Sequence, residues 1–359
     1  MSRKGIACIS ISVSCLLLVA LLAGGALLVR PAAAQQSFAG QTLVITDWGG
    51  PWGESLRRNV AAPFEKKYGV TVKFDVGKSY ENLAKVRAQR HNPQIDILFV
   101  DYGASQWAAQ EGLTVPLSNY AASIPNLADV YPQAVAPGQA FVATRVSAQG
   151  IMYNEQKIKK PVDSWAALWD KDFEGHVGVT GIQWGTGKMV TTAAFLMGGN
   201  EKSPDLGFNK LKELRKIKIF ESASQVAQLF QQGEVWIAPQ LGPAAYALQK
   251  SGMPIRFVLP KEGAFGMFDN MSIVKGGKEQ LAALFINFAL DPAVQVEHAK
   301  DLTVGPTNRK AVLPPDLQQK VPAGEQIGRL YLQDDRYANS QLPAWTERWN
   351  REVVPMITK

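Results

Sequence analysis

The amino-acid sequence predicts an α/β fold. From residue 42 onward, short apolar runs alternate with segments whose apolar residues recur at helical spacing, which is the pattern of strands connected by helices. The first predicted strands are Leu43–Thr46, Val70–Phe74 and Ile95–Val100, and a stripe of apolar residues predicts a helix over Leu56–Tyr68. Gly69 follows this helix as a typical C-terminal cap.

The stretch Thr46–Ser55, TDWGGPWGES, is the most informative turn in the chain. Glycine permits a sharp turn and close approach of a ligand, and a helix start attracts negative charge. Trp48 and Trp52 would add flat faces that attract apolar groups or cations. The turn is therefore a candidate small-molecule platform. The sequence leaves open a plain strand–helix turn whose Trp side chains lie in the core.

Two further turns carry an aromatic residue after a predicted strand. Asp101-Tyr102-Gly103 follows the strand Ile95–Val100, and Gly181–Gly187 contains Trp184 after the strand Val177–Thr180. In an open α/β sheet such turns lie together beyond the carboxyl ends of the strands, where ligands bind. We therefore expect Trp48 and Tyr102 to be neighbours.

The remaining elements continue the α/β alternation. Ser79 is the expected N-cap of a helix over Tyr80–Arg90. The stretch around Gly263–Asn270 has the composition of a loop. It is followed by a predicted strand at Met271–Val274. The tail from Leu313 to Lys359 is expected to be helical, with breaks at Pro314, Pro315, Pro322 and Pro343.

The first 34 residues have the pattern of a secretory signal peptide. A basic start at Arg3 and Lys4 precedes the uncharged run Ile6–Val29, and Ala32–Ala34 supplies small residues for cleavage after Ala34. We expect a periplasmic protein. The apolar run is also long enough to cross a bilayer, so an uncleaved membrane anchor is the alternative. Cys8 and Cys15 both lie in this segment, so the predicted mature chain has no disulfide.

The charge balance gives little support for nucleic-acid binding. Removing Arg3, Lys4 and Arg30 with the segment lowers the formal net charge from +7 to +4. That value is mild for a chain of this length, and the basic residues do not form a long cluster.

Several catalytic and cofactor patterns are absent from the sequence. The three histidines, His91, His176 and His298, are far apart and fit no metal-binding motif. No Gly-x-Ser-x-Gly elbow occurs, and Gly185–Lys188 fails as a phosphate loop because Met189 stands where Ser or Thr is needed. Lys188 is then interpreted as a solvated residue at a helix start. We expect no metal, no cofactor and no enzymatic activity; a secreted hydrolase using Asp101 or Asp269 is the alternative from another class.

Seven segments stand in a fixed order along the chain: Ile45–Trp48, Phe64–Val72 (FEKKYGVTV), Asp96–Leu117 (DILFVDYGASQWAAQEGLTVPL), Ile151–Asn154, Ser164–Gly175 (SWAALWDKDFEG), Gly252–Gly263 (GMPIRFVLPKEG) and Pro306–Asn308. In this order they resemble extracellular solute-binding proteins of ABC importers, in the branch that contains the spermidine/putrescine-binding proteins. The resemblance covers roughly Thr42 to Val312.

This resemblance implies two α/β lobes with a ligand in the cleft between them. Lobe 1 would combine residues 35–145 and 270–330, and lobe 2 would comprise residues 146–269. The crossing segments would lie near Ala143–Ala148 and Phe268–Ser272, and the tail, residues 331–359, would pack on lobe 1. The implied partners are a small solute and the permease of the inner membrane, and we expect a monomer.

The resemblance also implies a ligand held by aromatic rings and carboxylates, which suits ammonium groups. Trp48, Tyr102 and Asp269 match that pattern, whereas Met267 and Leu241 stand where the family has cleft tryptophans. This chain has fewer carboxylates at the expected cleft positions than the polyamine-binding members of the family. A long polyamine would therefore leave positive charge unpaired in the cleft. The expected function is therefore capture of a small polar solute that contains an amine, either polyamine-like or a smaller amine or zwitterion.

The predicted site follows from these turns. Trp48, Trp52 and Tyr102 would line one wall, with Trp184 opposite, and Asp269 is the first candidate for a ligand ammonium group. Weaker or additional candidates are Asp47, Asp101, Ser222, Ser224 and Met267. A small organic anion is the alternative ligand, and it would use the N–H groups of Gly49, Gly50 and Gly53.

Overall fold

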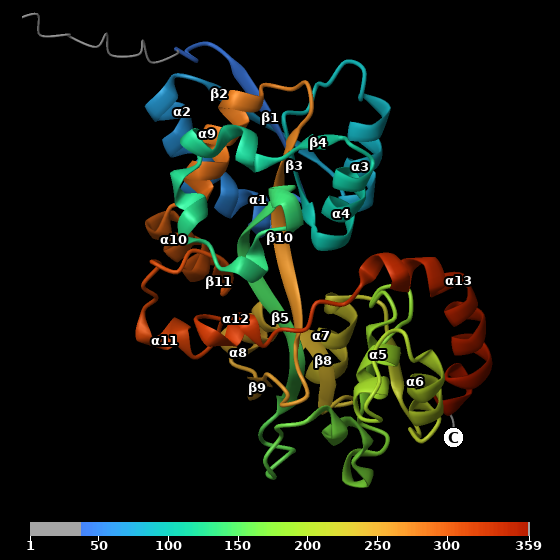
Figure 1. Cartoon of the computed structure of the whole chain (residues 1–359). Helices are drawn as coiled ribbons and strands as arrows, with labels where there is room; N and C mark the ends of the chain where they lie inside the picture. The colour runs from blue at the N-terminus through green and yellow to red at the C-terminus, as the bar shows by residue number, and fades with distance from the viewer. Residues whose placement is uncertain (1–36, 358–359) are drawn as a thin grey trace, which may run out of the picture. The chain divides into compact units, whose positions relative to one another are not determined.

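A computed structural model describes residues 37–357, so the predicted signal peptide over residues 1–34 lies outside the described part. Within the described residues, nine strands form one mixed sheet with the main order β11-β5-β10-β3-β1-β2 (Figure 1). β4 pairs with β10, β8 and β9 pair with β5, and β6 and β7 form a separate parallel pair. The strands are β1 (Thr42–Asp47), β2 (Thr71–Val76), β3 (Ile97–Asp101), β4 (Thr114–Val115), β5 (Val142–Asn154), β6 (Gly178–Thr180), β7 (Lys218–Phe220), β8 (Ile237–Leu241), β9 (Ile255–Val258), β10 (Phe265–Val274) and β11 (Gly305–Pro306).

Helices connect most of these strands, as the sequence predicts. The α-helices are α1 (Gly50–Leu56), α2 (Ala62–Tyr68), α3 (Ser79–Ala88), α4 (Tyr102–Gln110), α5 (Lys188–Phe195), α6 (Pro204–Leu211), α7 (Ala223–Gln231), α8 (Gly242–Lys250), α9 (Glu279–Ala289), α10 (Pro292–Leu302), α11 (Pro315–Gln318), α12 (Glu325–Gly328) and α13 (Asp335–Glu352). No helix between residues 37 and 357 is long and apolar enough to span a bilayer.

The helix that follows β1 confirms the predicted apolar stripe. α1 continues through a π-helical segment, Arg57–Ala61, into α2, and Gly69 ends the run with a left-handed φ of 68°. Leu56, Val60 and Phe64 are buried. Ser79, in contrast, is the first residue of α3 and Lys78 is its N-cap, so that predicted cap is wrong by one residue.

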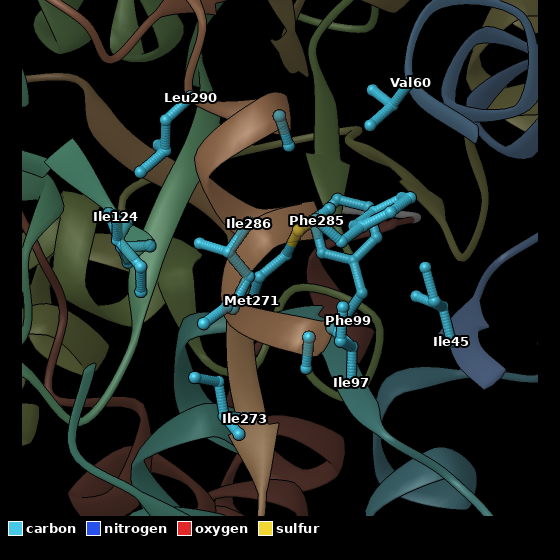
Figure 2. Packing of buried hydrophobic residues seen from close by; sticks show 14 of the residues in the cluster. Ile45, Val60, Ile97, Phe99, Ile124, Met271, Ile273, Phe285, Ile286 and Leu290 are labelled. Carbon is cyan, nitrogen blue, oxygen red and sulfur yellow. The ribbon is translucent and has the colours of Figure 1, made fainter. Parts of the chain in front are cut away.

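Two large hydrophobic clusters form the interior. The first cluster gathers buried residues of β1, β2, β3, α2 and α9, and Figure 2 shows its packing around Phe99, Met271 and Phe285. The second cluster gathers Trp165, Val190, Phe208 and other residues between Ile151 and Phe265, together with tail residues between Ala338 and Met356.

Long antiparallel strands connect the two clusters. β5 contributes Val146 to the first cluster and Ile151 to the second, whereas β10 contributes Phe268 to the first and Phe265 to the second. β10 begins at Phe265, so the stretch around Gly263–Asn270 is largely strand rather than loop. Pairing with β5 supplies backbone hydrogen bonds that the local composition does not indicate.

The C-terminal tail differs from the sequence-based expectations. Pro343 lies inside α13 rather than at a break. The start of α13 contacts predicted lobe 1, where Arg336 lies over the Trp107 ring of α4, whereas the buried side chains Trp345 and Trp349 belong to the second cluster. Burial of two Trp side chains outweighs the local preference of proline for a helix end. The chain reaches this position by a third passage between the clusters, from Ile327 to Ala338.

Candidate functional site

A cavity of about 260 Å³ lies where the strand ends of both clusters meet. β3 and α4 contribute Asp101 and Tyr102 to its lining, and β10 contributes Met267 and Asp269. The turn before α5 and the start of α13 line the other side with Trp184 and Asp335, among others. The cavity therefore collects residues that are separated by more than two hundred positions in the sequence.

Five of the ten predicted site residues line this cavity, namely Asp101, Tyr102, Trp184, Met267 and Asp269. The lining does not include the other five, Asp47, Trp48, Trp52, Ser222 and Ser224. The two groups differ in a physical way that the sequence does not reveal. Asp47, Trp48, Trp52 and Ser222 are engaged by contacts away from the cavity, and Ser224 is exposed on α7.

Asp101 is held at the cavity by two local contacts. It is the N-cap of α4, and its Oδ1 accepts a hydrogen bond of 3.2 Å from the backbone N–H of Ala104. Its own N–H donates to Ser79 Oγ at 3.3 Å. Burial raises the pKa of Asp101 and the negative charge of Asp335 adds to the rise, whereas hydrogen bonding of the carboxyl group to Ser79 and Ala104 and the charge of Lys188 oppose it. Among residues 37–357, no Lys or Arg forms a salt bridge with this carboxylate.

Asp269, the first candidate for a ligand ammonium group, already has an internal cation. Asp269 and Arg145 are register partners on β10 and β5, and Arg145 Nε lies 2.6 Å from Asp269 Oδ2. The prediction treated this carboxylate as unpaired, and the structure corrects it. Burial nevertheless raises the pKa of Asp269, while Arg145 opposes the rise. The pair is hidden from sequence analysis because its members are 124 residues apart.

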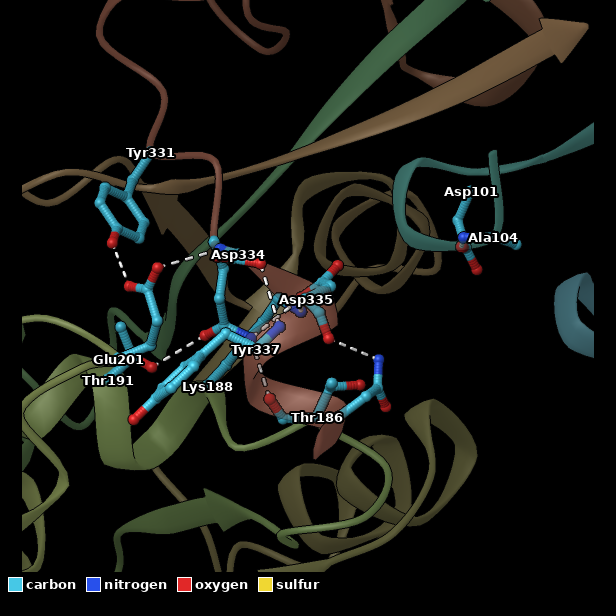
Figure 3. Close-up of polar contacts among 12 residues, drawn as sticks. Asp101, Ala104, Thr186, Lys188, Thr191, Glu201, Tyr331, Asp334, Asp335 and Tyr337 are labelled. Atoms are coloured by element: carbon cyan, nitrogen blue, oxygen red, sulfur yellow. Dashed lines mark hydrogen bonds and ion pairs between the residues drawn. The ribbon is translucent and has the colours of Figure 1, made fainter. Parts of the chain in front are cut away.

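Lys188 and Asp335 form a second ion pair at the cavity, with Nζ and Oδ1 3.4 Å apart (Figure 3). The interpretation of Lys188 as a solvated residue is wrong, because it is 7 % exposed and lines the cavity. Asp335 comes from the tail, which sequence reasoning assigned elsewhere. Gln333 fixes this segment by donating from Nε2 to Asp335 Oδ1 and to the carbonyl oxygen of Thr186, both at 2.9 Å.

The wall formed by β6 and β8 presents two hydrogen-bonding groups with free capacity. Thr180 Oγ1 and Gln240 Nε2 are buried, and within the described residues neither has a hydrogen-bond partner. Both residues line the cavity. The Gln240 side-chain oxygen is engaged by the N–H of Leu241 at 2.8 Å, which leaves the amide nitrogen as the available donor. Buried donors without partners are costly, so a polar ligand atom is a natural partner here.

The turn after β1 serves the core instead of the cavity. Trp48 packs edge-to-face on Phe99 with ring centroids 5.0 Å apart, and its Nε1 donates to Ser79 Oγ at 3.0 Å. The Trp52 ring covers the guanidinium of Arg145 at 4.7 Å from its centroid. Tyr102 lines the cavity and packs against Phe141, whereas Trp48 does not line the cavity.

The buried side chain of Asp47 is hydrogen-bonded inside the same turn. It is 1 % exposed, and its Oδ2 accepts a hydrogen bond from the N–H of Gly49 at 3.1 Å. The Gly53 N–H donates to the carbonyl of Gly49. These internal bonds occupy two of the three N–H groups assigned to an anionic ligand, and none of Gly49, Gly50 and Gly53 lines the cavity.

The two serines also have a local explanation. Ser222 is the N-cap of α7, and its Oγ accepts a hydrogen bond of 3.1 Å from the N–H of Gln225. Ser224 is an exposed residue of the same helix. Between residues 37 and 357 no group of His, Cys, Asp and Glu forms a candidate metal site.

Sequence reasoning missed Tyr80, Thr180, Lys188, Gln240 and Asp335 as cavity residues. The ends of predicted strands could have indicated Thr180 and Gln240, because both lie where β6 and β8 end. No local signal marks Asp335, since its place depends on the packing of α13.

Comparison with known proteins agrees with the fold. Residues 59–323 match the model of the family described as bacterial extracellular solute-binding protein. A gamma-aminobutyric acid-binding protein of Pseudomonas aeruginosa is 26 % identical over 301 residues, which cover 79 % of this chain and 82 % of that protein. The spermidine/putrescine-binding periplasmic protein of Escherichia coli is 25 % identical over 337 residues, covering 90 % and 94 % of the two chains.

A solved structure of an ABC transporter protein from Clostridium perfringens superposes with a TM-score of 0.75 at 25 % identity, covering 87 % of this chain and 99 % of that one. This likeness shows the mixed α/β fold of periplasmic binding proteins. The family match extends over more than half of the chain and identifies a binding protein rather than a hydrolase. The chain belongs to the bacterial extracellular solute-binding protein family.

Proposed function

We propose that this protein captures a small organic solute with a single ammonium group in the cavity and delivers it to the permease of an ABC importer. The observation that carries this proposal is the state of Asp101. Of the three carboxylates lining the cavity, Asp269 and Asp335 are in salt bridges and Asp101 is not. An ammonium group would supply the partner that Asp101 lacks among the described residues, through a charge-assisted hydrogen bond.

The rest of the cavity suits the other end of such a solute. Tyr80, Tyr102 and Trp184 offer aromatic faces, which attract a cation and pack on its carbon chain. Thr180 Oγ1 and Gln240 Nε2 offer hydrogen bonds to an acceptor atom. The best fit is an amine whose far end carries a hydroxyl, carbonyl or carboxylate oxygen.

Cavity size and charge argue against a long polyamine. A volume of about 260 Å³ is below the ~300–1,000 Å³ of pockets for drug-sized ligands. A second ammonium group would meet carboxylates that Arg145 and Lys188 already neutralise. Relatives named for spermidine, putrescine and gamma-aminobutyric acid thus show the range of solutes to test on this chain.

We also propose how the parts of the chain cooperate. Residues 35–145 and 270–330 would form one lobe and residues 146–269 the other, with the tail now assigned to the second lobe because of Trp345 and Trp349. The lobes would close over the solute by bending where β5 and β10 cross between the clusters. The exported form would be a periplasmic monomer that has lost residues 1–34.

Calorimetric titration with matched solutes tests the proposal. Aminobutanol and gamma-aminobutyric acid should bind more tightly than putrescine, and butanol should not bind. Asp101→Asn should weaken the amines by about 1.5–3 kcal/mol, the scale of a charged hydrogen bond. Asp75→Asn is the matched control, because Asp75 pairs with Lys85 and does not line the cavity.

Two outcomes would contradict the proposal. Unchanged amine affinity in Asp101→Asn would exclude this carboxylate as the ammonium partner, and tighter binding of a simple carboxylate than of any amine would favour the anionic alternative. Mass spectrometry of the solute after incubation distinguishes capture from turnover, because a binding protein returns the solute intact.

A further inference from the structure

The Arg145–Asp269 pair has a position that sets it apart from the surface ion pairs. It joins β5 and β10 between the two clusters, at the point where their register shifts between Asp269 and Asn270. The Arg145 side chain is 1 % exposed, whereas Asp269 reaches the cavity lining. The Arg145 guanidinium is therefore buried, and the Asp269 carboxylate that it contacts lines the cavity.

The surroundings of Arg145 hold its charge in place. The guanidinium carbon lies 4.7 Å from the ring centroid of Trp52 and 5.0 Å from that of Phe99. Nη1 and Nη2 are buried, and they have no hydrogen-bond partner among residues 37–357. Asp47 is close enough for the charge of Arg145 to oppose the rise in its pKa that burial causes.

Stability alone is a weak explanation for this arrangement. Desolvation of two charges generally cancels most of their attraction, and well-packed apolar residues in their place are often equally stable. Two guanidinium nitrogens without partners add to the cost. The pair does, however, change what the cavity presents to a ligand, because it cancels the charge of one lining carboxylate.

We infer that Arg145 determines ligand specificity by neutralising Asp269, so that the cavity offers one uncompensated carboxylate and selects solutes with one ammonium group over diamines. This inference rests on the proposed function and deepens it. With Asp269 paired to Arg145 and Asp335 paired to Lys188, Asp101 is the one cavity-lining carboxylate that has no internal salt bridge among the described residues. A second ligand ammonium group would have to compete with Arg145 for Asp269.

Three variants form a cycle that tests the inference. Arg145→Met frees Asp269 from its internal cation, and the preference for putrescine over aminobutanol should rise by roughly tenfold or more. Asp269→Asn leaves Arg145 uncompensated and should weaken both amines. The double variant Arg145→Met/Asp269→Asn again has one uncompensated carboxylate, so its preference should return to that of the wild type.

The return of selectivity in the double variant is the decisive measurement, because a purely structural role would not restore it. If Arg145→Met does not fold, Asp269→Asn and the double variant still decide the question: the double variant should bind amines more tightly than Asp269→Asn. Equal amine affinity in these two variants, or an unchanged putrescine preference in folded Arg145→Met, overturns the inference.

The same titrations separate failure of the inference from failure of the proposed function. If the wild type binds aminobutanol and loses it in Asp101→Asn, the function stands whatever Arg145 does. If the wild type binds no amine, the proposed function fails. The inference about Arg145 then fails with it, because there is no amine selectivity for Arg145 to determine.

Discussion

The turns over residues 48–53 and 181–187 look alike in the sequence, since each follows a strand and combines glycines with tryptophan. In the structure the tryptophans of the two turns have different surroundings. The first turn packs Trp48 on Phe99 and encloses Asp47, whereas the second presents Trp184, which is 40 % exposed, to the cavity. Both rings pack edge-to-face on a buried phenylalanine, Phe99 or Phe220, but only Trp184 also lines the cavity.

Loss of the two tryptophans should give the largest difference between these turns. Trp48→Ala removes a half-buried ring that packs against the first cluster and should lower the free energy of unfolding by about 3 kcal/mol. Trp184→Ala should cost less than about 0.5 kcal/mol, the usual scale for exposed positions. Denaturant unfolding of both variants is the measurement, and equal losses would contradict the assignment of the first turn to the core.

The glycines of the first turn should sharpen the comparison. A Cβ at Gly53 would lie 2.1 Å from Asp47 Oδ2, so Gly53→Ala should destabilise the protein by about 2–3 kcal/mol. Gly50→Ala is the control: its Cβ would meet nothing within 4 Å, and its φ of 56° should cost only about 1 kcal/mol. The same denaturant experiment would refute the tight enclosure of Asp47 if both variants were equally stable.

The carboxylates Asp47 and Asp101 extend the comparison to pH. Burial raises the pKa of both above 3.8, but Asp101 lines the cavity and Asp47 does not. Because an ammonium group needs ionised Asp101, amine affinity should fall as the pH falls through its raised pKa, by about 1.5–3 kcal/mol in all. Calorimetry from neutral to acidic pH measures this.

Two variants assign this pH dependence. Asp101→Asn should lose it, since no carboxylate at that position remains to take up a proton. Asp47→Asn should retain it, because Asp47 contributes no lining group. The opposite result would transfer the ammonium site to the first turn.

The ring of Trp184 should make a modest contribution to binding. Trp184→Ala should weaken amine binding by about twofold to fivefold, the scale of a cation–π contact of ~0.5–1 kcal/mol at a partly exposed site. Trp184→Phe should recover part of this loss because it keeps an aromatic face. Full affinity in Trp184→Ala would place the ligand away from the second turn.

The serines near α7 should give the smallest effects. Ser222→Ala removes the cap of α7 and should cost about 1 kcal/mol of stability without changing amine affinity. Ser224→Ala, at an exposed position, should change neither quantity. Thermal unfolding and calorimetry on both variants check this, and weaker binding in Ser222→Ala would return that serine to the site.

The sequence by itself determined the α/β alternation, the helix with its apolar stripe at Leu56, Val60 and Phe64, and the resemblance to solute-binding proteins that the family match confirms. These properties follow from local periodicity and from motifs in a fixed order. It also placed Asp101, Tyr102 and Trp184 at strand ends that meet at the cavity.

Only the tertiary structure decided which carboxylate remains without an internal cation. Asp269 is paired because β5 and β10 bring Arg145 beside it across 124 residues, and Asp335 lines the cavity because α13 packs on the second cluster. Charge pairing depends on distances of a few ångströms between remote segments. Local sequence patterns carry no information about such distances. The sequence therefore indicated Asp269 as the carboxylate without a cation, whereas in the fold that carboxylate is Asp101.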